Sequence, residues 1–418
     1  MQPVYIALTI DSDYTTAVAA RKNDEGQLII LDSERKNSEG VKYGEIVNPS
    51  EAGFVVKKTL ELLENRINKK ITSVYVGYNG RSLKTFNTTI QRSFTHATVV
   101  SPEILNDIEK EMNEAELETG KIYGIYQQEI SIDNEIEINP MGCNCQTINV
   151  NYRVVVGKPE LKENLSRCFD RTGFIIANSE LQLIATADML LSKNEKDQGC
   201  VLVDFGDSCT SIVVYHHQFM RYLWVLPLGK RNIVQDLMSL DIPRSLAEEI
   251  TIKIGDLNPT PEMASKQLVI RSETDENQVM KVQVKTLNMI IEARMEEIVD
   301  AVWKAILRSR VSDQLGSGLV ISGTASKLKN IDQYLQNKLK MPVRYASHSQ
   351  FLADGASPLY HDIAYAPVVS LLLAANQDCL YHEMEQGKNK NKKEPKIKRT
   401  FSEIKKKLGD SFEIFFES

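Results

Sequence analysis

The sequence predicts an α/β protein that is made of two similar halves. Each half opens with a hydrophobic strand, an acidic turn and a second strand, at residues 4–20 and again at residues 200–215. In the first half these are followed by a helix at 51–68, with its apolar residues on one stripe, and by a buried strand at 71–76. That order of elements is typical of an α/β domain.

Length and composition indicate a protein of the cytosol. A chain of 418 residues suggests roughly two to four domains. A net charge of −6 argues against broad binding of nucleic acid, which depends on a basic surface. The six cysteines do not form a disulfide pattern, and Cys143 and Cys145 lack a second pair at zinc-site spacing. The amino terminus has no basic leader, and the longest apolar run (366–375) is half of a membrane span, so we expect no transmembrane segment.

The elements between and after the two openings follow from periodicity and caps. Residues 81–162 predict a small α+β insertion, with strands at 82–90, 125–132 and 147–156 around a helix at 102–118. Further helices are predicted at 160–172, 179–192, 232–240, 245–254, 286–309 and 328–339, and a buried strand at 318–322. Ser245, with Glu248 three residues later, predicts a capping box. His216 and His217 fall in a hairpin turn, where histidines are usually solvated rather than metal-bound.

The turn from Asp204 to Thr210 carries the chemistry of the second half. Gly206 permits a close approach to the backbone, and free backbone N–H groups at such a turn can form an anion-binding nest. Asp204 and Asp207 would repel a bare phosphate, so they suit a metal-bound phosphate or an activated water. The alternative is an ordinary hairpin with a polar turn in water. If this turn faces the turn at 11–16, the two could hold the phosphates of a nucleotide, and the glycine turn at 322–324 could hold the nucleoside.

These three turns, in this order, resemble those of the superfamily of actin, sugar kinases and DnaK-type chaperones. The resemblance is closest to the FtsA family of bacterial division proteins and covers residues 1 to about 384. Residues 203–215 resemble the second phosphate loop and 318–325 the adenosine loop. Residues 245–255 and 291–294 resemble two helix segments of the nucleotide lobe. The most specific segment is 127–142, which resembles the insertion of FtsA proteins.

The resemblance implies an actin-like two-lobed α/β fold of duplicated ribonuclease H-like domains with an FtsA-type α+β insertion subdomain. Subdomain IA would comprise 1–80, continued by 163–198 and 361–384, and the insertion subdomain IC would comprise 81–162. Subdomain IIA would comprise 199–232, continued by 296–360. Subdomain IIB, at 233–295, would bind the FtsZ tail. A linker at 385–398 and a helix at 399–418 would complete the chain.

The resemblance also implies ATP and Mg²⁺ as ligands, with Asp11 and Asp204 acting through Mg²⁺. The residues expected to contact the nucleotide are Asp11, Ser12, Tyr14, Asp204, Gly206, Asp207, Ser208, Cys209, Thr210, Lys230, Lys253, Ser322, Gly323, Thr324 and Ala325. The family pattern has more glycines: the first loop lacks its glycine here, and Asp207, Ser208 and Cys209 replace those of the second. Because each added side chain narrows the approach to phosphate, we expect a weak ATPase at most.

The last segment of the sequence predicts a membrane anchor. Residues 385–398 are rich in lysine and poor in apolar residues, which is typical of a disordered linker. Apolar residues then recur at helical spacing with lysines beside them, the pattern of an interfacial helix. A helix docked on the body and a calmodulin-type target peptide are the alternatives. The predicted membrane contacts are Phe401, Ile404, Lys405, Lys406, Leu408, Phe412, Phe415 and Phe416.

Together these features predict a division adaptor that anchors FtsZ to the cytoplasmic face of the inner membrane at the division site. Its expected partners are the carboxy-terminal tail of FtsZ, the anionic membrane surface, other copies of itself in filaments, and other division proteins. A pilus-assembly-type actin-like ATPase and a metabolic kinase of the same superfamily remain the alternative functions.

Overall fold

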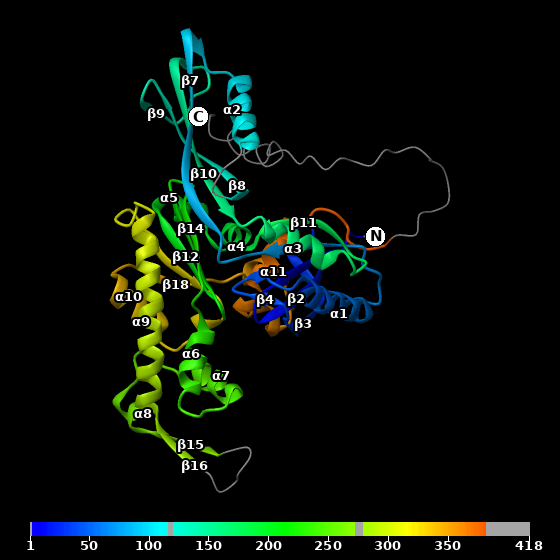
Figure 1. The fold of residues 1–418 in the computed structure, drawn as a ribbon, viewed down its shortest axis with the longest axis vertical. Coiled ribbons are helices and arrows are strands. Elements are labelled where there is room, and N and C mark those ends of the chain that lie inside the picture. The colour runs from blue at the N-terminus through cyan, green and yellow to red at the C-terminus, as the bar shows by residue number, and fades with distance from the viewer. Residues whose placement is uncertain (1, 116–119, 272–278, 382–418) are drawn as a thin grey trace. The chain divides into compact units, whose positions relative to one another are not determined.

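The structure is a computed structural model, and it describes residues 2–115, 120–271 and 279–381. All of these residues belong to one compact unit, which ends at Tyr381. Two sheets of the same design organise this unit (Figure 1). The described part of the chain contains no helix that is long and apolar enough to cross a membrane.

The first sheet has the strand order β11-β6-β1-β2-β3. Strands β1 to β3 form an antiparallel meander, and β6 and β11 add parallel strands beside β1. All six residues of β1 are buried, so the sheet needs cover on both faces. The strands are β1 (Tyr5–Ile10), β2 (Tyr14–Lys22), β3 (Leu28–Asn37), β6 (Ser73–Tyr78) and β11 (Ile175–Leu181). The covering helices are α1 (Pro49–Ile67), α3 (Glu160–Phe169), α4 (Gln182–Leu190) and α11 (Ala366–Ala374).

Helix α1 illustrates why these segments fold locally. The side chain of Asn48 accepts hydrogen bonds from the amides of Ser50 and Glu51, and Pro49 begins the helix where no amide donor is needed. Val56, Leu60 and Leu63 lie on the buried stripe and have no exposed surface. The helix ends at Asn68, whose left-handed backbone stops it. A short two-stranded ribbon, β4 (Val41–Lys42) and β5 (Glu45–Ile46), precedes α1.

The second sheet repeats this design in the order β18-β17-β12-β13-β14. Again an antiparallel meander, β12 to β14, is joined by two parallel strands, β17 and β18. The duplication predicted from the two openings is therefore confirmed. The strands are β12 (Cys200–Phe205), β13 (Thr210–His216), β14 (Phe219–Leu226), β17 (Gly318–Ser322) and β18 (Val343–Tyr345). Below, the first sheet with its helices is called the first lobe, and the second sheet with helices α6 to α10 is called the second lobe.

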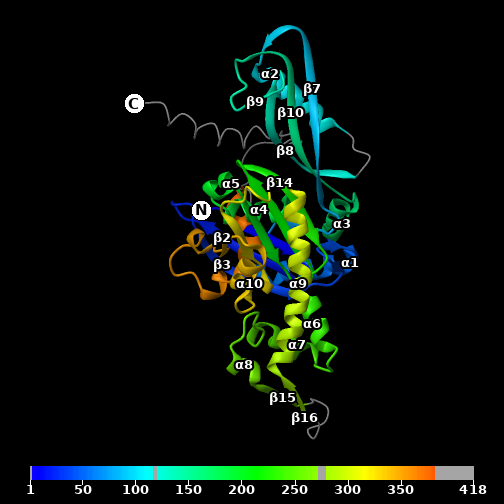
Figure 2. The same ribbon diagram turned by 90° about the vertical axis from the view of Figure 1, so that its left-hand side faces the viewer.

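Helices of the second lobe pack on one face of its sheet, where they form a core of their own. Its long helix α9 (Val284–Arg308) runs beside this sheet, and helices α6 to α8 lie toward one end with a small hairpin (Figure 2). The other elements are α5 (Lys193–Gln198), α6 (Lys230–Met238), α7 (Arg244–Lys253), α8 (Pro261–Ser265), β15 (Gln267–Arg271), β16 (Val279–Gln283) and α10 (Ile331–Leu339). Short 3-10 turns lie at Thr324–Lys327, Ser349–Phe351, Pro358–His361 and Ile363–Tyr365.

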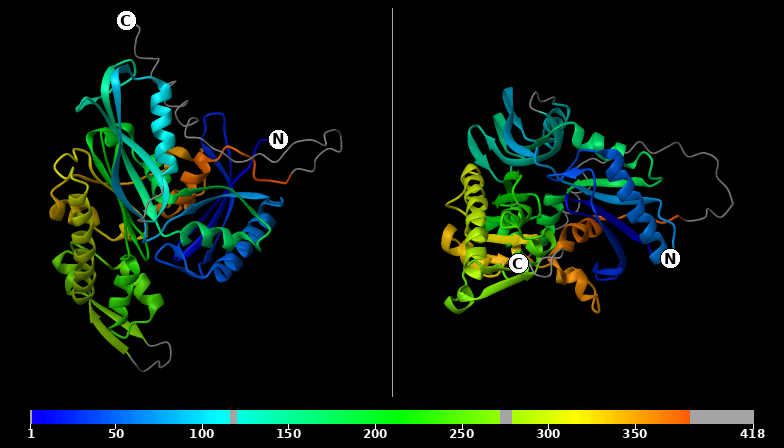
Figure 3. Two further views of the ribbon diagram at one scale, coloured as in Figure 1. Left: turned by 45° about the horizontal axis from the view of Figure 1, so that its top comes forward. Right: turned by 60° about the horizontal axis from the view of Figure 1, so that its bottom comes forward.

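The segment from Lys84 to Gly157 forms an insertion that extends the second sheet. Strand β7 pairs with β14 at Lys84 and Trp224, and the sheet then continues β7-β10-β8-β9. Helix α2 covers this extension through a separate apolar core (Figure 3). The elements are β7 (Lys84–Val99), α2 (Pro102–Glu114), β8 (Lys121–Ile132), β9 (Glu135–Glu137) and β10 (Asn144–Gly157).

Two predictions about local structure are wrong. Residues 179–192 do not form one helix, because 175–181 pair with β6 as strand β11 before α4 begins. Ser245 does not cap a helix either: α7 begins one residue earlier, after Pro243, and no side chain caps it. Instead Glu248 forms an ion pair with Arg244 across one turn of α7.

Candidate functional site

The three predicted turns meet in one pocket between the two lobes. The β1–β2 turn supplies Asp11 to Tyr14, the β12–β13 turn supplies Asp204 and residues 206–209, and the turn after β17 supplies Gly323 and Thr324. This convergence follows from the duplication, because each meander presents its first turn at the same edge of its sheet. The predicted residues that line the pocket are Asp11, Ser12, Tyr14, Asp204, Gly206, Asp207, Ser208, Cys209, Gly323 and Thr324.

Both acidic turns leave backbone donors unused. The amide of Asp11 donates to the carbonyl of Tyr14 (3.0 Å), and that of Gly206 donates to the carbonyl of Cys209 (3.0 Å). Among the described residues, the amides at 12 and 13 and the three at 207–209 donate no hydrogen bond. A run of unpaired N–H groups at a turn can form an anion-binding nest. The pocket therefore offers two runs of amides that are available to an anion.

Two positions in the pocket turns require glycine because a side chain there would collide with the protein's own backbone. A Cβ on Gly206 would lie 2.7 Å from the carbonyl oxygen of Cys209, within its own turn. Gly323 has a φ of +87°, and a Cβ there would lie 2.5 Å from the carbonyl oxygen of Phe205 and 2.7 Å from Asp204 Oδ1. Gly206 does not adopt a positive φ, which the sequence allowed. Gly206 thus lets its own turn close, and Gly323 lets the turn after β17 pack against the end of β12.

Carboxylates crowd the pocket and are poorly compensated. Burial, and then the neighbouring carboxylate of Asp13, raise the pKa of Asp11 to about 7. Burial raises the pKa of Asp204 to about 6. The pKa of Asp13 is also raised, by burial and then by the carboxylate of Asp207. A ligand that brings positive charge is favoured at such a site, because it stabilises the ionised carboxylates.

These carboxylates fit a magnesium ion that arrives with a nucleotide. No three metal-binding side chains converge on one point among the residues that the structure describes. Mg²⁺ commonly keeps several waters and binds through one or two carboxylates together with substrate phosphates. Asp11 and Asp204 could serve in this way, beside the amides that would take the phosphate oxygens.

Sequence reasoning missed Gln182, which lies at the start of α4 in the same pocket. Its Nε2 donates to Asp11 Oδ1 (3.0 Å), and its Oε1 is buried and has no partner among the described residues. An unpaired carbonyl oxygen beside a carboxylate can orient a water molecule. Strand β11 would have indicated this residue, because a strand that ends at Leu181 places the next side chain at the edge of the sheet where the pocket lies. That strand was not predicted from the sequence.

Some predicted site residues lie away from the pocket lining. The Thr210 hydroxyl donates to the carbonyl of Leu228 (2.9 Å). Ser322 and Ala325 are buried in the interior of the second lobe. Lys253 is exposed and pairs with Glu249 on α7. Lys230 pairs with Asp207 (3.4 Å) at the rim. The predicted membrane contacts, from Phe401 to Phe416, lie outside the described residues.

Comparison with solved structures supports the fold. The chain is similar to a "PilM-PilN type IV pilus biogenesis complex" with a TM-score of 0.61 and 14% identity, over 88% of this chain and 98% of that one. It is also similar to MreB 5 of Spiroplasma citri bound to AMPPNP, with a TM-score of 0.54 and 11% identity, over 88% and 95% of the two chains. The predicted actin-like fold is thus confirmed.

Comparison with known sequences shows a similarity to cell division proteins. Residues 201–370 match the family model "Cell division protein FtsA". The FtsA protein of Borreliella burgdorferi is 23% identical and covers 94% of this chain and 95% of its own, and that of Neisseria meningitidis is 25% identical and covers 90% and 91%. The FtsA protein of Bacillus subtilis is 26% identical over 82% and 78% of the two chains. The chain is therefore similar to FtsA proteins over most of its length, as its sequence motifs predicted.

Proposed function

We propose that this division protein binds Mg-ATP in the pocket between its lobes. The observation that carries the proposal is the convergence of three turns, two of them with unused amide donors, on one acidic pocket. The amides at 12–13 and 207–209 would take phosphate oxygens, and Asp11 and Asp204 would hold Mg²⁺ through water. Gly323 and Thr324, in the turn after β17, would hold the nucleoside. The similar MreB 5 protein was solved bound to AMPPNP, which agrees with this assignment.

A titration with fluorescent ATP tests the proposal directly. Purified protein is titrated with and without Mg²⁺, and fluorescence anisotropy is recorded. We expect saturable binding that weakens when Mg²⁺ is removed, because the pocket carboxylates would then face an uncompensated triphosphate. Absence of saturable binding in both conditions would remove the nucleotide from the proposed function. Hydrolysis, if present, is expected to be slow.

We further propose that the protein anchors FtsZ at the cytoplasmic face of the inner membrane and assembles into actin-like filaments with its own copies. The proposal rests on the similarity to FtsA proteins and on the apolar, lysine-flanked segment at 399–418. Residues 233–295, assigned by this proposal to subdomain IIB, would bind the FtsZ tail. Subdomains IA, IC and IIA, with the boundaries given above, and other division proteins as partners belong to the same proposal.

Co-sedimentation with vesicles tests the membrane part. Protein with and without residues 399–418 is spun with vesicles that contain anionic lipid, and we expect only the full chain to pellet. Binding should weaken with added salt, because lysine attraction to an anionic surface is screened. An equal pellet for both forms would refute the anchor. A metabolic kinase would instead show steady phosphoryl transfer to a small substrate, and a pilus-type relative would not need 399–418.

A further inference from the structure

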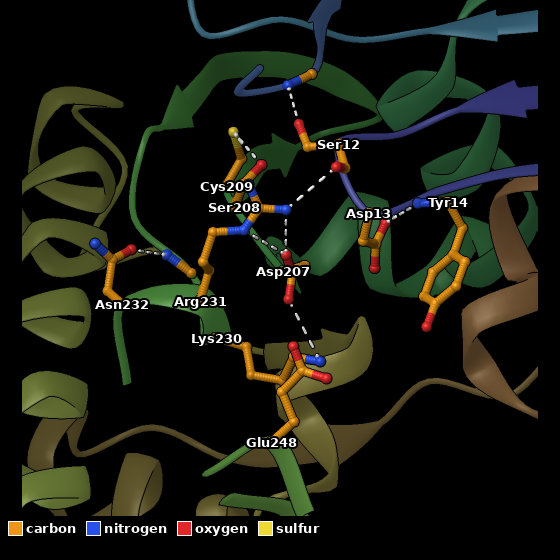
Figure 4. A network of polar contacts seen from close by, with 12 residues as sticks. Ser12, Asp13, Tyr14, Asp207, Ser208, Cys209, Lys230, Arg231, Asn232 and Glu248 are labelled. Atoms are coloured by element: carbon orange, nitrogen blue, oxygen red, sulfur yellow. Dashed lines mark hydrogen bonds and ion pairs between the residues drawn. The ribbon is translucent and has the colours of Figure 1, made fainter. Parts of the chain in front are cut away.

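Arg231 bridges the two lobes beside the pocket, through Asp207 and Ser12, which both line it. It lies in the first turn of α6, and its Nε donates to Asp207 Oδ2 (3.0 Å). Its Nη2 donates to the carbonyl oxygen of Ser12 (3.2 Å), in the turn of the opposite lobe. Lys230 reaches the other carboxylate oxygen, Asp207 Oδ1, at 3.4 Å. Figure 4 shows the carboxylate of Asp207 held between the two cations.

This arrangement resembles an anion-binding site in which the carboxylate of Asp207 is the bound anion. A carboxylate, of which 9% of the side chain is exposed, lies between an arginine and a lysine. The same residue opens the run of three unused amides at 207–209. Arginine presents a planar fork that suits carboxylate and phosphate alike. The carboxylate of Asp207 therefore takes the cations that a phosphate beside these amides would need.

We propose that Asp207 is an internal substitute for a phosphate group, and that Arg231, with Lys230, binds the phosphates of the nucleotide once Asp207 releases them. The proposal rests on the proposed binding of ATP and assigns to that site a cation pair and a competing carboxylate. An ion pair with a purely structural role is the alternative. That alternative does not account for the unused amides at 207–209.

Charge decides the direction of the effect. Asp13 lies close enough to Asp207 for the two carboxylates to repel one another, and Lys230 and Arg35 are the cations that offset Asp13. An incoming phosphate adds further negative charge, so it competes with Asp207 for Arg231 and Lys230. Removal of the charge on Asp207 should therefore favour the nucleotide, and removal of the charge on Arg231 should oppose it.

The experiment compares four variants by anisotropy titration with fluorescent Mg-ATP. Asp207→Asn keeps the shape of the side chain, and we expect it to tighten binding about tenfold. Arg231→Gln should weaken binding by a similar factor. The double variant should lose the gain of Asp207→Asn, because the released cation is then missing. Arg244→Gln removes an arginine from an exposed ion pair on α7 and serves as the matched control.

Each outcome decides the inference. Binding by Asp207→Asn that depends on Arg231 supports it, even if the wild-type protein binds too weakly to measure. If wild type binds and both single variants bind equally well, the inference fails while the proposed ATP binding stands. If Arg231→Gln lowers only the melting temperature, the ion pair is structural and the inference also fails. If none of the proteins, Asp207→Asn included, binds ATP, both proposals fail.

Discussion

At the scale of single residues, the pocket carries an electrostatic cost in the protein without ligand. The pKa of Asp11 is raised to about 7 and that of Asp204 to about 6, whereas an ordinary aspartate has a pKa near 3.8. A folded-state pKa above that of the unfolded chain means that folding is opposed once the group ionises. Such acids are typical of binding sites rather than of structural ion pairs.

The first prediction concerns pH and Asp11. Between about pH 4 and pH 7 the folded protein keeps a proton that the unfolded chain has lost, so the free energy of unfolding falls as the pH rises through this range. Asp11→Asn should remove the part of this dependence that is due to Asp11 and stabilise the protein at pH 8 by roughly 1–3 kcal/mol, whereas the part that is due to Asp204 should remain. Urea denaturation at pH 5 and pH 8, without nucleotide or Mg²⁺, measures both effects. An unchanged pH dependence in the variant would contradict the assignment.

The second prediction separates close packing from backbone conformation in the glycine turn. Gly323 and Gly355 both have a positive φ, +87° and +83°, but a Cβ on Gly355 would meet nothing within 4 Å. Gly355→Ala should therefore cost about 1 kcal/mol of conformational strain alone. Gly323→Ala should cost about 2–4 kcal/mol, because the new Cβ would also collide with the carbonyl of Phe205. Thermal unfolding of the two variants makes the comparison, and equal losses would contradict it.

At the scale of elements, the predictions that rested on local sequence patterns succeeded, and those that depended on contacts between distant segments failed. Helix α1 was predicted within two residues, because its apolar stripe is a local signal. Strand β11 was missed since its pairing partner, β6, lies about a hundred residues earlier in the chain and leaves no local pattern. In the same way the pocket turns were predicted from their residue types. Gln182 and the ion pair of Arg231 depend on contacts between distant segments, which the sequence does not reveal.

The third prediction concerns the amino-terminal caps. Asn48→Ala should cost about 1 kcal/mol of stability, because two amides of α1 would lose their acceptor. Ser245 is a suitable control, as it lies exposed in the first turn of α7 and caps no helix. Ser245→Ala should leave the urea midpoint nearly unchanged. A loss in the control equal to that of Asn48→Ala would show that the capping assignment is wrong.

At the scale of the whole described chain, the insertion joins the second lobe by more than one contact. In addition to the pairing of Lys84 with Trp224, Arg221 on β14 forms a bidentate ion pair with Glu129 on β8. The Arg221 side chain is 13% exposed and that of Glu129 is 27% exposed, so the pair is better shielded than an ordinary surface pair. The sequence predicted an insertion here but not that its strands would extend the second sheet.

The fourth prediction tests this connection. Arg221→Gln should destabilise the protein by about 1–3 kcal/mol, since it leaves the Glu129 carboxylate partly buried without its partner. It should also speed hydrogen exchange in β8 and β10. Arg92→Gln, which removes the more exposed pair with Glu111 inside the insertion, is the control and should change either quantity little. Equal exchange in both variants would argue that the pair does not join the insertion to the lobe.

The path of the chain through this insertion has a mechanical consequence. The segment leaves the first lobe after β6, which ends at Tyr78, and returns to it at α3, which begins at Glu160. Its strand β7 nevertheless pairs with β14, the edge strand of the second lobe. Because the joints at 79–83 and 158–159 are short, a rotation of one lobe against the other would bend the chain there. The insertion would then act as a lever arm, whose outer end travels farther than the hinge from which it is driven.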